Sequence, residues 1–173
     1  MKNILLRTSL FAGLLTALVA CSDFGSSKAE AMIIPPTKIS MTDQPGVPAG
    51  WVTDYKAALE LAKKENRPVL IDFTGSDWCG WCIKLDRETF SKEAFKTYAK
   101  DNLVLLYLDF PNEKPQDAAL KQQNVKLKGE YGVRGFPTMV LLSPDGKKIW
   151  QNGGYLAGGP DALISAINKA TGK

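Results

Sequence analysis

The chain has 173 residues, with 22 basic and 18 acidic side chains, three cysteines and no histidine. Its hydrophobic content of 45% is enough to bury the core of one domain, which excludes a wholly disordered protein. The lack of histidine excludes Ser-His-Asp and Cys-His catalysis, histidine-containing zinc sites and imidazole acid–base chemistry, so any reaction must use thiols, carboxylates, amines or backbone.

The N-terminal segment has the pattern of a bacterial export signal. Two basic residues precede an apolar run that is too short to span a bilayer comfortably. The run ends in Leu18-Val19-Ala20-Cys21, which resembles a lipobox, a motif whose cysteine is lipidated and becomes the new N-terminus. We therefore predict a lipoprotein-type signal peptide over residues 1–20 and a lipid on Cys21. The alternative is a plain secretory signal that ends at Ala29-Glu30-Ala31 and leaves a soluble periplasmic or secreted protein.

Removal of residues 1–20 would lower the formal net charge from +4 to +2, because the segment carries Lys2 and Arg7 and no acid. No basic run with interleaved aromatic residues remains, so nothing in the sequence supports nucleic-acid binding. Residues 21–50 are rich in Ser, Pro, Gly, Thr and Ala without a sustained period, which predicts a lipidated cysteine and a flexible tether. The alternative for residues 47–52 is a first edge strand.

Helix and strand patterns alternate through residues 51–173, which we predict to form one domain. The predicted helices cover the segment from a cap at Thr53 or Asp54 to residue 66, residues 79–88, residues 92–100 with Ser91 as the cap, residues 116–123 and residues 160–170. The alternative for the fourth helix is an irregular continuation to Tyr131. The predicted strands cover residues 69–73, 103–108, 138–143 and 147–151, and the last two form a hairpin. Helices between strands imply parallel pairing, and the hairpin adds an antiparallel edge. The expected fold is α/β, with a central mixed β-sheet and helices on both faces.

Cys79 and Cys82 directly follow the strand at 69–73, where the next helix is expected to begin. The nucleophile in disulfide exchange is a thiolate, which the free N–H groups and positive dipole at a helix start favour. We therefore predict that Cys79 attacks a disulfide and that Cys82, one turn further, resolves the product. The alternatives are a static disulfide and a metal centre shared by two chains, because one chain cannot supply four zinc ligands here. No cofactor is predicted.

Three separated motifs resemble those of thioredoxins and occur in the same order. They are an apolar strand that contains an acid, the segment Trp78-Cys79-Gly80-Trp81-Cys82, and the segment Tyr131 to Thr138 with its Phe-Pro-Thr end. The resemblance covers roughly residues 51–173 and implies a thioredoxin fold. Residues 73–78 are similar to a secreted bacterial branch of the superfamily.

The resemblance implies further site residues. Asp72 matches the buried acid that relays a proton for the resolving cysteine, and burial would raise the pKa of such a carboxyl. Pro137 matches the cis-proline, which would place the backbone of Phe136 against a substrate strand. An ordinary trans proline and a structural buried aspartate are the alternatives. The residues predicted to contact substrate are Trp78, Gly80, Trp81, Phe136 and Pro137.

The chain also departs from typical thioredoxin. One extra residue lies between Asp72 and Cys79, the dipeptide between the cysteines is Gly80-Trp81, and no lysine occurs near Leu105 on the neighbouring strand. The dipeptide lacks the histidine that stabilises the thiolate in strongly oxidising relatives. We therefore expect a reductase or isomerase rather than a strong oxidant.

Together these features predict a thiol–disulfide oxidoreductase of the bacterial cell envelope that reduces or isomerises disulfides of exported proteins. Lipid anchoring on the periplasmic side is expected, with the outer membrane slightly favoured because Ser22 follows the lipidated cysteine. A membrane thiol–disulfide electron relay would re-reduce the cysteine pair. The alternatives are a disulfide-donating oxidase and a binding or chaperone module that uses Trp78, Trp81 and Pro137.

Overall fold

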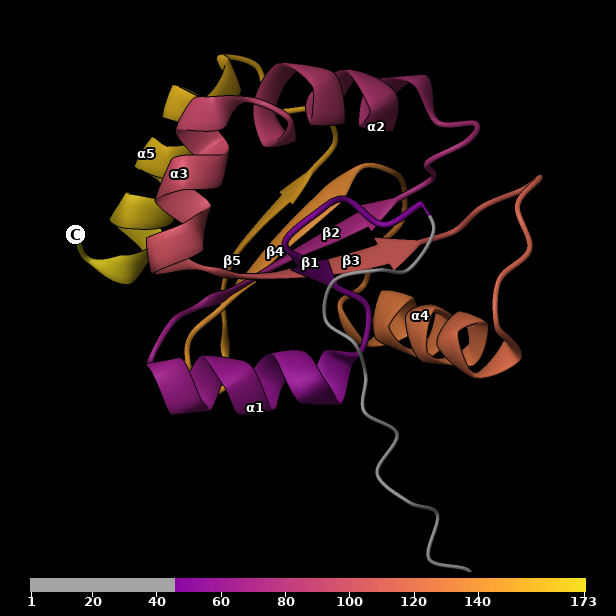
Figure 1. The fold of residues 1–173 in the computed structure, drawn as a ribbon, viewed down its shortest axis with the longest axis horizontal. Coiled ribbons are helices and arrows are strands. Elements are labelled where there is room, and N and C mark those ends of the chain that lie inside the picture. Colours follow the sequence, from indigo (N-terminus) through magenta and orange to yellow (C-terminus); the bar gives the residue numbers. More distant parts are fainter. Residues whose placement is uncertain (1–45) are drawn as a thin grey trace, which may run out of the picture. The chain divides into compact units, whose positions relative to one another are not determined.

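The computed structural model describes residues 46–173 (Figure 1). The predicted signal peptide, Cys21 and all but the last five residues of the predicted tether lie outside the described residues. The elements in chain order are β1 (Trp51–Val52), α1 (Tyr55–Glu65), β2 (Val69–Thr74), α2 (Gly80–Leu85), the π-helical turn η1 (Asp86–Phe90), α3 (Glu93–Asn102), β3 (Val104–Asp109), α4 (Ala118–Glu130), β4 (Thr138–Leu142), β5 (Lys148–Gly153) and α5 (Gly159–Thr171).

The five strands form one mixed sheet in the order β1-β3-β2-β4-β5. β3 pairs in parallel with β1 and β2, while β4 pairs antiparallel with β2 and β5. All six residues of the central strand β2 are buried, which is why its sequence is almost continuously apolar. The prediction of a central mixed sheet is confirmed. Of residues 47–52, for which an edge strand is the alternative, only Trp51 and Val52 form the parallel edge strand β1.

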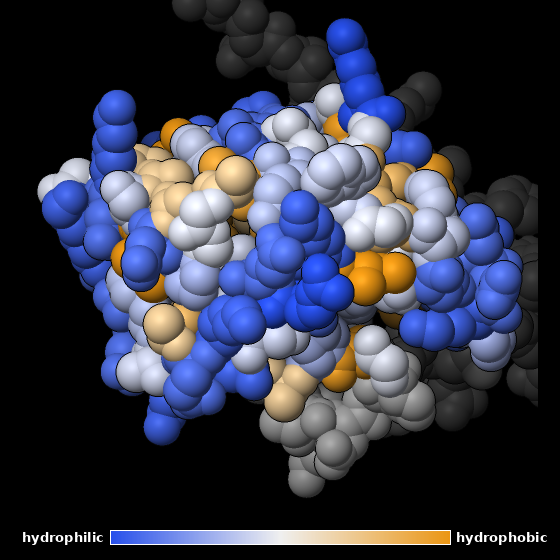
Figure 2. Space-filling model, turned by 90° about the horizontal axis from the view of Figure 1, so that it is seen from above, coloured by the Kyte–Doolittle hydropathy of each residue, from blue (hydrophilic) through white to orange (hydrophobic). Residues whose placement is uncertain are grey.

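Helices cover both faces of the sheet, with α1 and α4 on one face and α2, α3 and α5 on the other (Figure 1). Successive strand residues point to opposite faces, so the core is divided in two. Ile71 and Phe73 belong to the core cluster that includes Ala58 and Ala62 of α1. Leu70 belongs to the second cluster, together with side chains of α2, α3 and α5. The outer surface of this second helical layer is mainly hydrophilic, with apolar side chains in separate patches (Figure 2).

The differences between predicted and observed helix boundaries are small, and local hydrogen bonds account for several of them. α3 has Lys92 rather than Ser91 at its N-cap, because the Ser91 hydroxyl instead donates a hydrogen bond to Asp86 over 3.0 Å. The helix predicted over 79–88 ends as regular α-helix at Leu85 and continues as the turn η1. α4 begins two residues later than predicted, since the Asp117 carboxylate accepts hydrogen bonds from two backbone N–H groups of its first turn. Within residues 46–173, every helix falls short of the length and apolarity that a membrane span requires.

Candidate active site

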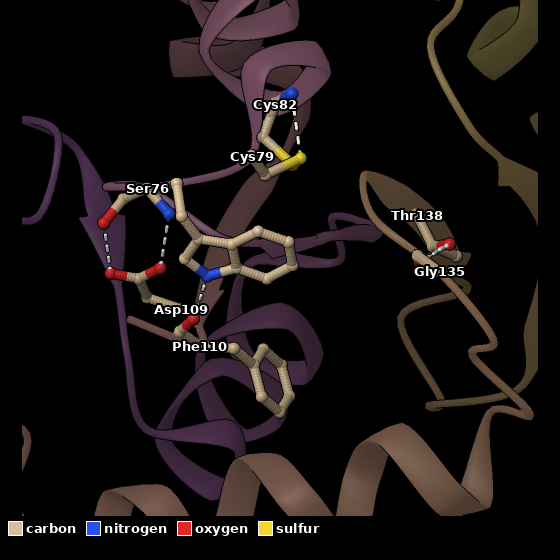
Figure 3. Close-up of a disulfide and its surroundings, with 8 residues drawn as sticks. Ser76, Cys79, Cys82, Asp109, Phe110, Gly135 and Thr138 are labelled. Carbon is tan, nitrogen blue, oxygen red and sulfur yellow. Dashed lines mark hydrogen bonds between the residues drawn. A yellow bond between two sulfur atoms is a disulfide. The ribbon is translucent and has the colours of Figure 1, made fainter. Parts of the chain in front are cut away.

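Cys79 and Cys82 are joined by a disulfide at the start of α2, with their Cα atoms 5.2 Å apart (Figure 3). Cys79 is the N-cap of α2, and its Sγ accepts a hydrogen bond from the Cys82 backbone N–H over 3.2 Å. A donor at this position favours a thiolate on Cys79 once the disulfide is reduced. Cys79 is 7% exposed and Cys82 4%, so Cys79 is the more exposed residue of the pair by only a small margin.

Asp72 lies in the middle of β2 and is 3% exposed. It shares a face of the strand with Leu70, which is the face that α2 covers. Its Oδ1 has no hydrogen-bond partner among residues 46–173. Burial raises the pKa of the Asp72 carboxyl well above its ordinary value, and the negative charges of Asp86 and Asp109 raise the pKa further. Asp72 therefore holds a proton at pH values where a surface aspartate is ionised.

The residue of β3 opposite Asp72 is Tyr107, which corrects the position near Leu105 expected from the sequence. Leu105 instead pairs with Leu70, two residues earlier in β2. Burial raises the pKa of the Tyr107 phenol, so its side chain is neutral at physiological pH. A neutral phenol thus occupies the register position beside the buried acid, and no cation there offsets the upward shift of the Asp72 pKa.

The segment that leads from β2 to the cysteines is attached to the end of β3. The backbone N–H and hydroxyl of Ser76 donate hydrogen bonds to the Asp109 carboxylate over 2.9 and 2.6 Å (Figure 3). The Trp78 indole N–H donates to the Phe110 carbonyl over 2.8 Å. A Cβ built on Gly75 would lie 2.6 Å from the Trp78 ring, so only glycine allows this ring position. These contacts fix the loop between Asp72 and Cys79, which is one residue longer than in typical thioredoxin.

Asp77 provides a second attachment for the same loop. Its carboxylate accepts hydrogen bonds from the backbone N–H groups of Asn112, Glu113 and Lys114 over 3.0, 2.9 and 3.1 Å. These bonds, with that from Asn112 the strongest, lower the pKa of Asp77. Sequence reasoning missed Asp77 and Asp109, because their partners lie more than thirty residues away and leave no local pattern.

The third sequence motif comes together with the cysteines in space. The Phe136–Pro137 peptide bond is cis, and Pro137 is buried. The Thr138 hydroxyl donates to the Gly135 carbonyl over 2.8 Å and fixes the turn into β4 (Figure 3). The Trp78 ring meets the Phe136 ring edge-on, with centroids 5.9 Å apart. The tryptophan before the first cysteine and the phenylalanine before the cis-proline therefore form one surface.

The dipeptide between the cysteines presents a second aromatic group. Gly80 is exposed, and the Trp81 side chain is 58% exposed, compared with 47% for Trp78. Trp81 packs on Tyr155, which follows β5, with centroids 5.4 Å apart. The Tyr155 hydroxyl donates to the Glu88 carboxylate, and this bond lowers the pKa of Glu88. Sequence reasoning missed Tyr155, since it lies in a glycine-rich loop with no motif of its own.

Residues 55–171 match the family model described as a thioredoxin-like domain. The disulfide bond reductase DsbH of Chlamydia pneumoniae is 37% identical over 116 residues, which are 67% of this chain and 69% of that protein. The thioredoxin-related protein DsbJ of the same organism is 31% identical over 105 residues, 61% of this chain but only 30% of that protein. A solved structure of a DsbH oxidoreductase has 35% identity and a TM-score of 0.65, covering 75% of this chain and 90% of that one. The chain therefore belongs to the thioredoxin-like family and has the thioredoxin fold.

Proposed function

We propose that the protein is a thiol–disulfide oxidoreductase of the bacterial cell envelope that reduces or isomerises disulfides of exported proteins. The observation that carries the proposal is the Cys79–Cys82 disulfide at the start of α2, with exposed tryptophans and a cis-proline loop beside it. The similarity to proteins named disulfide bond reductase and thioredoxin-related protein supports the reaction class. Its location on the periplasmic side follows from the export signal expected in the sequence.

The proposed reaction is two successive thiol–disulfide exchanges. In the reduced protein, the Cys79 thiolate attacks one sulfur of a substrate disulfide and releases the other sulfur as a thiolate. The Cys82 thiolate then attacks Cys79 Sγ in the mixed disulfide, releases the second substrate sulfur and closes the Cys79–Cys82 disulfide. Two electrons pass from the pair to the substrate, so a dithiol donor such as a membrane thiol–disulfide relay must reduce the pair again.

Asp72 supplies a proton acceptor for the second exchange in this proposal. Cys82 is nearly buried and is a weaker nucleophile as a neutral thiol than as a thiolate. A buried carboxylate with a raised pKa accepts a proton more readily than a surface carboxylate does. The ionised form of Asp72 thus takes the proton of Cys82 when the mixed disulfide is resolved, and Asp72 returns the proton when the pair is reduced.

We expect the Cys79–Cys82 pair to have the reduction potential of a reductant. No imidazole lies between the cysteines to stabilise the thiolate, so the potential should be more negative than about −200 mV, closer to thioredoxin than to a strong oxidase. Equilibration of the purified domain with glutathione buffers, followed by Trp fluorescence or thiol alkylation, measures it. A value near about −120 mV would contradict the reductase direction and favour a disulfide donor.

We propose lipid anchoring through Cys21, which lies outside the described residues. Cys21→Ser should abolish lipid attachment, because only the cysteine thiol of the lipobox-like segment can carry the thioether-linked lipid. Mass spectrometry and membrane fractionation of the full chain expressed in a bacterium measure the result, with Ser22→Ala as the matched control. Unchanged mass and membrane retention in Cys21→Ser would instead support the plain secretory signal.

A further inference from the structure

Two lysines near the cysteine pair are each held above two aromatic rings. The Lys84 Nζ lies 5.1 Å from the centroid of the Trp81 ring and 4.8 Å from that of Tyr155. The Lys128 Nζ lies 5.1 Å from the Phe136 centroid and 5.8 Å from that of Phe110. At these distances the ring faces attract the ammonium groups, which restricts the position of each charge.

The two lysines reach the site from opposite sides of the sheet. Lys84 belongs to α2 on one face, and Lys128 belongs to α4 on the other (Figure 1). Trp81 is part of the dipeptide between the cysteines, while Phe136 precedes the cis-proline and contacts the ring of Trp78. Lys84 therefore lies over the ring between the two cysteines, and Lys128 lies over the ring that precedes the cis-proline.

In addition to a hydrogen bond from a tyrosine hydroxyl, the Lys84 charge lowers the pKa of Glu88, but Lys84 forms no close ion pair with it. Within residues 46–173, neither Lys84 nor Lys128 takes part in a salt bridge. The nearby carboxylates of Asp77, Glu88 and Asp109 already accept hydrogen bonds from groups of the chain itself. These hydrogen bonds leave the carboxylates charged but hold them to the chain. The ammonium groups of Lys84 and Lys128 lie over aromatic rings and can donate hydrogen bonds to acceptor groups on a bound segment.

We infer that Lys84 and Lys128 select exported substrates in which acidic residues flank the target cysteine on both sides. The inference rests on the proposed function and names its substrate class. The exposed rings of Trp78 and Trp81 contact the apolar part of the bound segment, and the lysines pair with its carboxylates. Because the rings already restrict both ammonium groups, less side-chain entropy is lost on pairing than for free surface lysines.

The test compares three disulfide-linked peptides of equal length whose cysteine is flanked by Glu, Gln or Lys. The wild-type domain is expected to reduce the Glu peptide with a kcat/KM about tenfold above that of the Gln peptide at low salt. This factor is the most that two favourable surface ion pairs usually contribute. The Lys peptide should be the poorest substrate. The preference should shrink as salt is raised to about 1 M, where the screening length is only about 3 Å.

Lys84→Gln and Lys128→Gln are each expected to lower the Glu-to-Gln preference about threefold, while Lys84→Arg and Lys128→Arg retain it. Lys63→Gln, an exposed change in the last turn of α1, is the matched control and should alter neither the preference nor the turnover of the Gln peptide. A purely structural role of the lysines would lower the rates for all peptides equally, and this result would overturn the inference.

Equal kcat/KM values for the three peptides at low salt would also overturn the inference while leaving disulfide reduction intact. Failure of the wild-type domain to reduce any of the peptides would overturn the proposed function and the inference together. The two failures are therefore distinguishable in one experiment.

Discussion

Cys82→Ser is expected to accumulate mixed disulfides between Cys79 and exported proteins, whereas Cys79→Ser is expected to accumulate none. Cys79 is the N-cap of α2, and its Sγ accepts a hydrogen bond from the backbone N–H of Cys82, so we expect the thiolate of the reduced pair to be stabilised on this sulfur. Without Cys82, the first exchange occurs and the second cannot. Multiple-turnover reduction of insulin should fall roughly a thousandfold or more in either variant, since each lacks one of the two covalent steps.

The trapping experiment uses the full chain in its native cell. Acid quenching, alkylation, non-reducing electrophoresis and mass spectrometry identify the captured proteins, and a reductant should release them. The double variant Cys79→Ser with Cys82→Ser is the matched control for non-covalent association. Unfolding curves of each variant verify that a buried serine has not unfolded the domain. Trapping by Cys79→Ser instead of Cys82→Ser would reverse the assigned roles.

Asp72→Asn is expected to slow resolution of the mixed disulfide by about a hundredfold at neutral pH. This is the lower end of the rate decrease that usually follows the loss of a general base. Asparagine has nearly the same shape as a protonated aspartate but cannot accept the proton of Cys82. Stopped-flow measurement of the second exchange, starting from a purified mixed disulfide, isolates this step. An unchanged rate would assign Asp72 a structural role only.

The same substitution should stabilise the oxidised domain at neutral pH. The pKa of Asp72 is raised in the folded state from an ordinary value of 3.8, so the folded state binds this proton more tightly than the unfolded state does. The contribution of Asp72 to stability is therefore fully present below pH 3.8 and is lost as the pH rises through the folded-state pKa. Asp72→Asn removes this loss, so the gain should grow by about 1.4 kcal/mol for each pH unit between 3.8 and the folded-state pKa.

Guanidinium unfolding of the wild type and Asp72→Asn at pH 4, 6 and 8 measures this dependence, with the disulfide closed in both proteins. The stability difference should be small at pH 4 and grow with pH. Thr89→Val, which removes the other buried side-chain oxygen without a partner in the described chain, is the matched control and should give a difference independent of pH. A flat difference for Asp72→Asn would contradict the raised pKa. Higher stability with a slower second exchange would identify Asp72 as a residue retained for function.

Local patterns in the sequence predicted the fold class and the cysteine site. The apolar run of β2 and the turn between β4 and β5 are short-range features, as is the position of Cys79 at the start of a helix. Such features depend on neighbours within a few residues, so a period or a spacing is enough to detect them. The same information placed the cap of α3 wrongly at Ser91, because the turn η1 gave its hydroxyl another partner.

The surroundings of the cysteines were decided only by the tertiary structure. The register of β2 against β3 places Tyr107 opposite Asp72, and no periodic pattern encodes a register between strands that are thirty residues apart. The attachment of the Asp77 carboxylate to the loop after β3 and the packing of Trp81 on Tyr155 arise in the same way. The sequence by itself thus determined that two cysteines lie at the start of a helix, directly after a buried strand of a mixed sheet. Packing of distant segments decided the raised pKa of the buried acid and the aromatic and charged surface beside the cysteines.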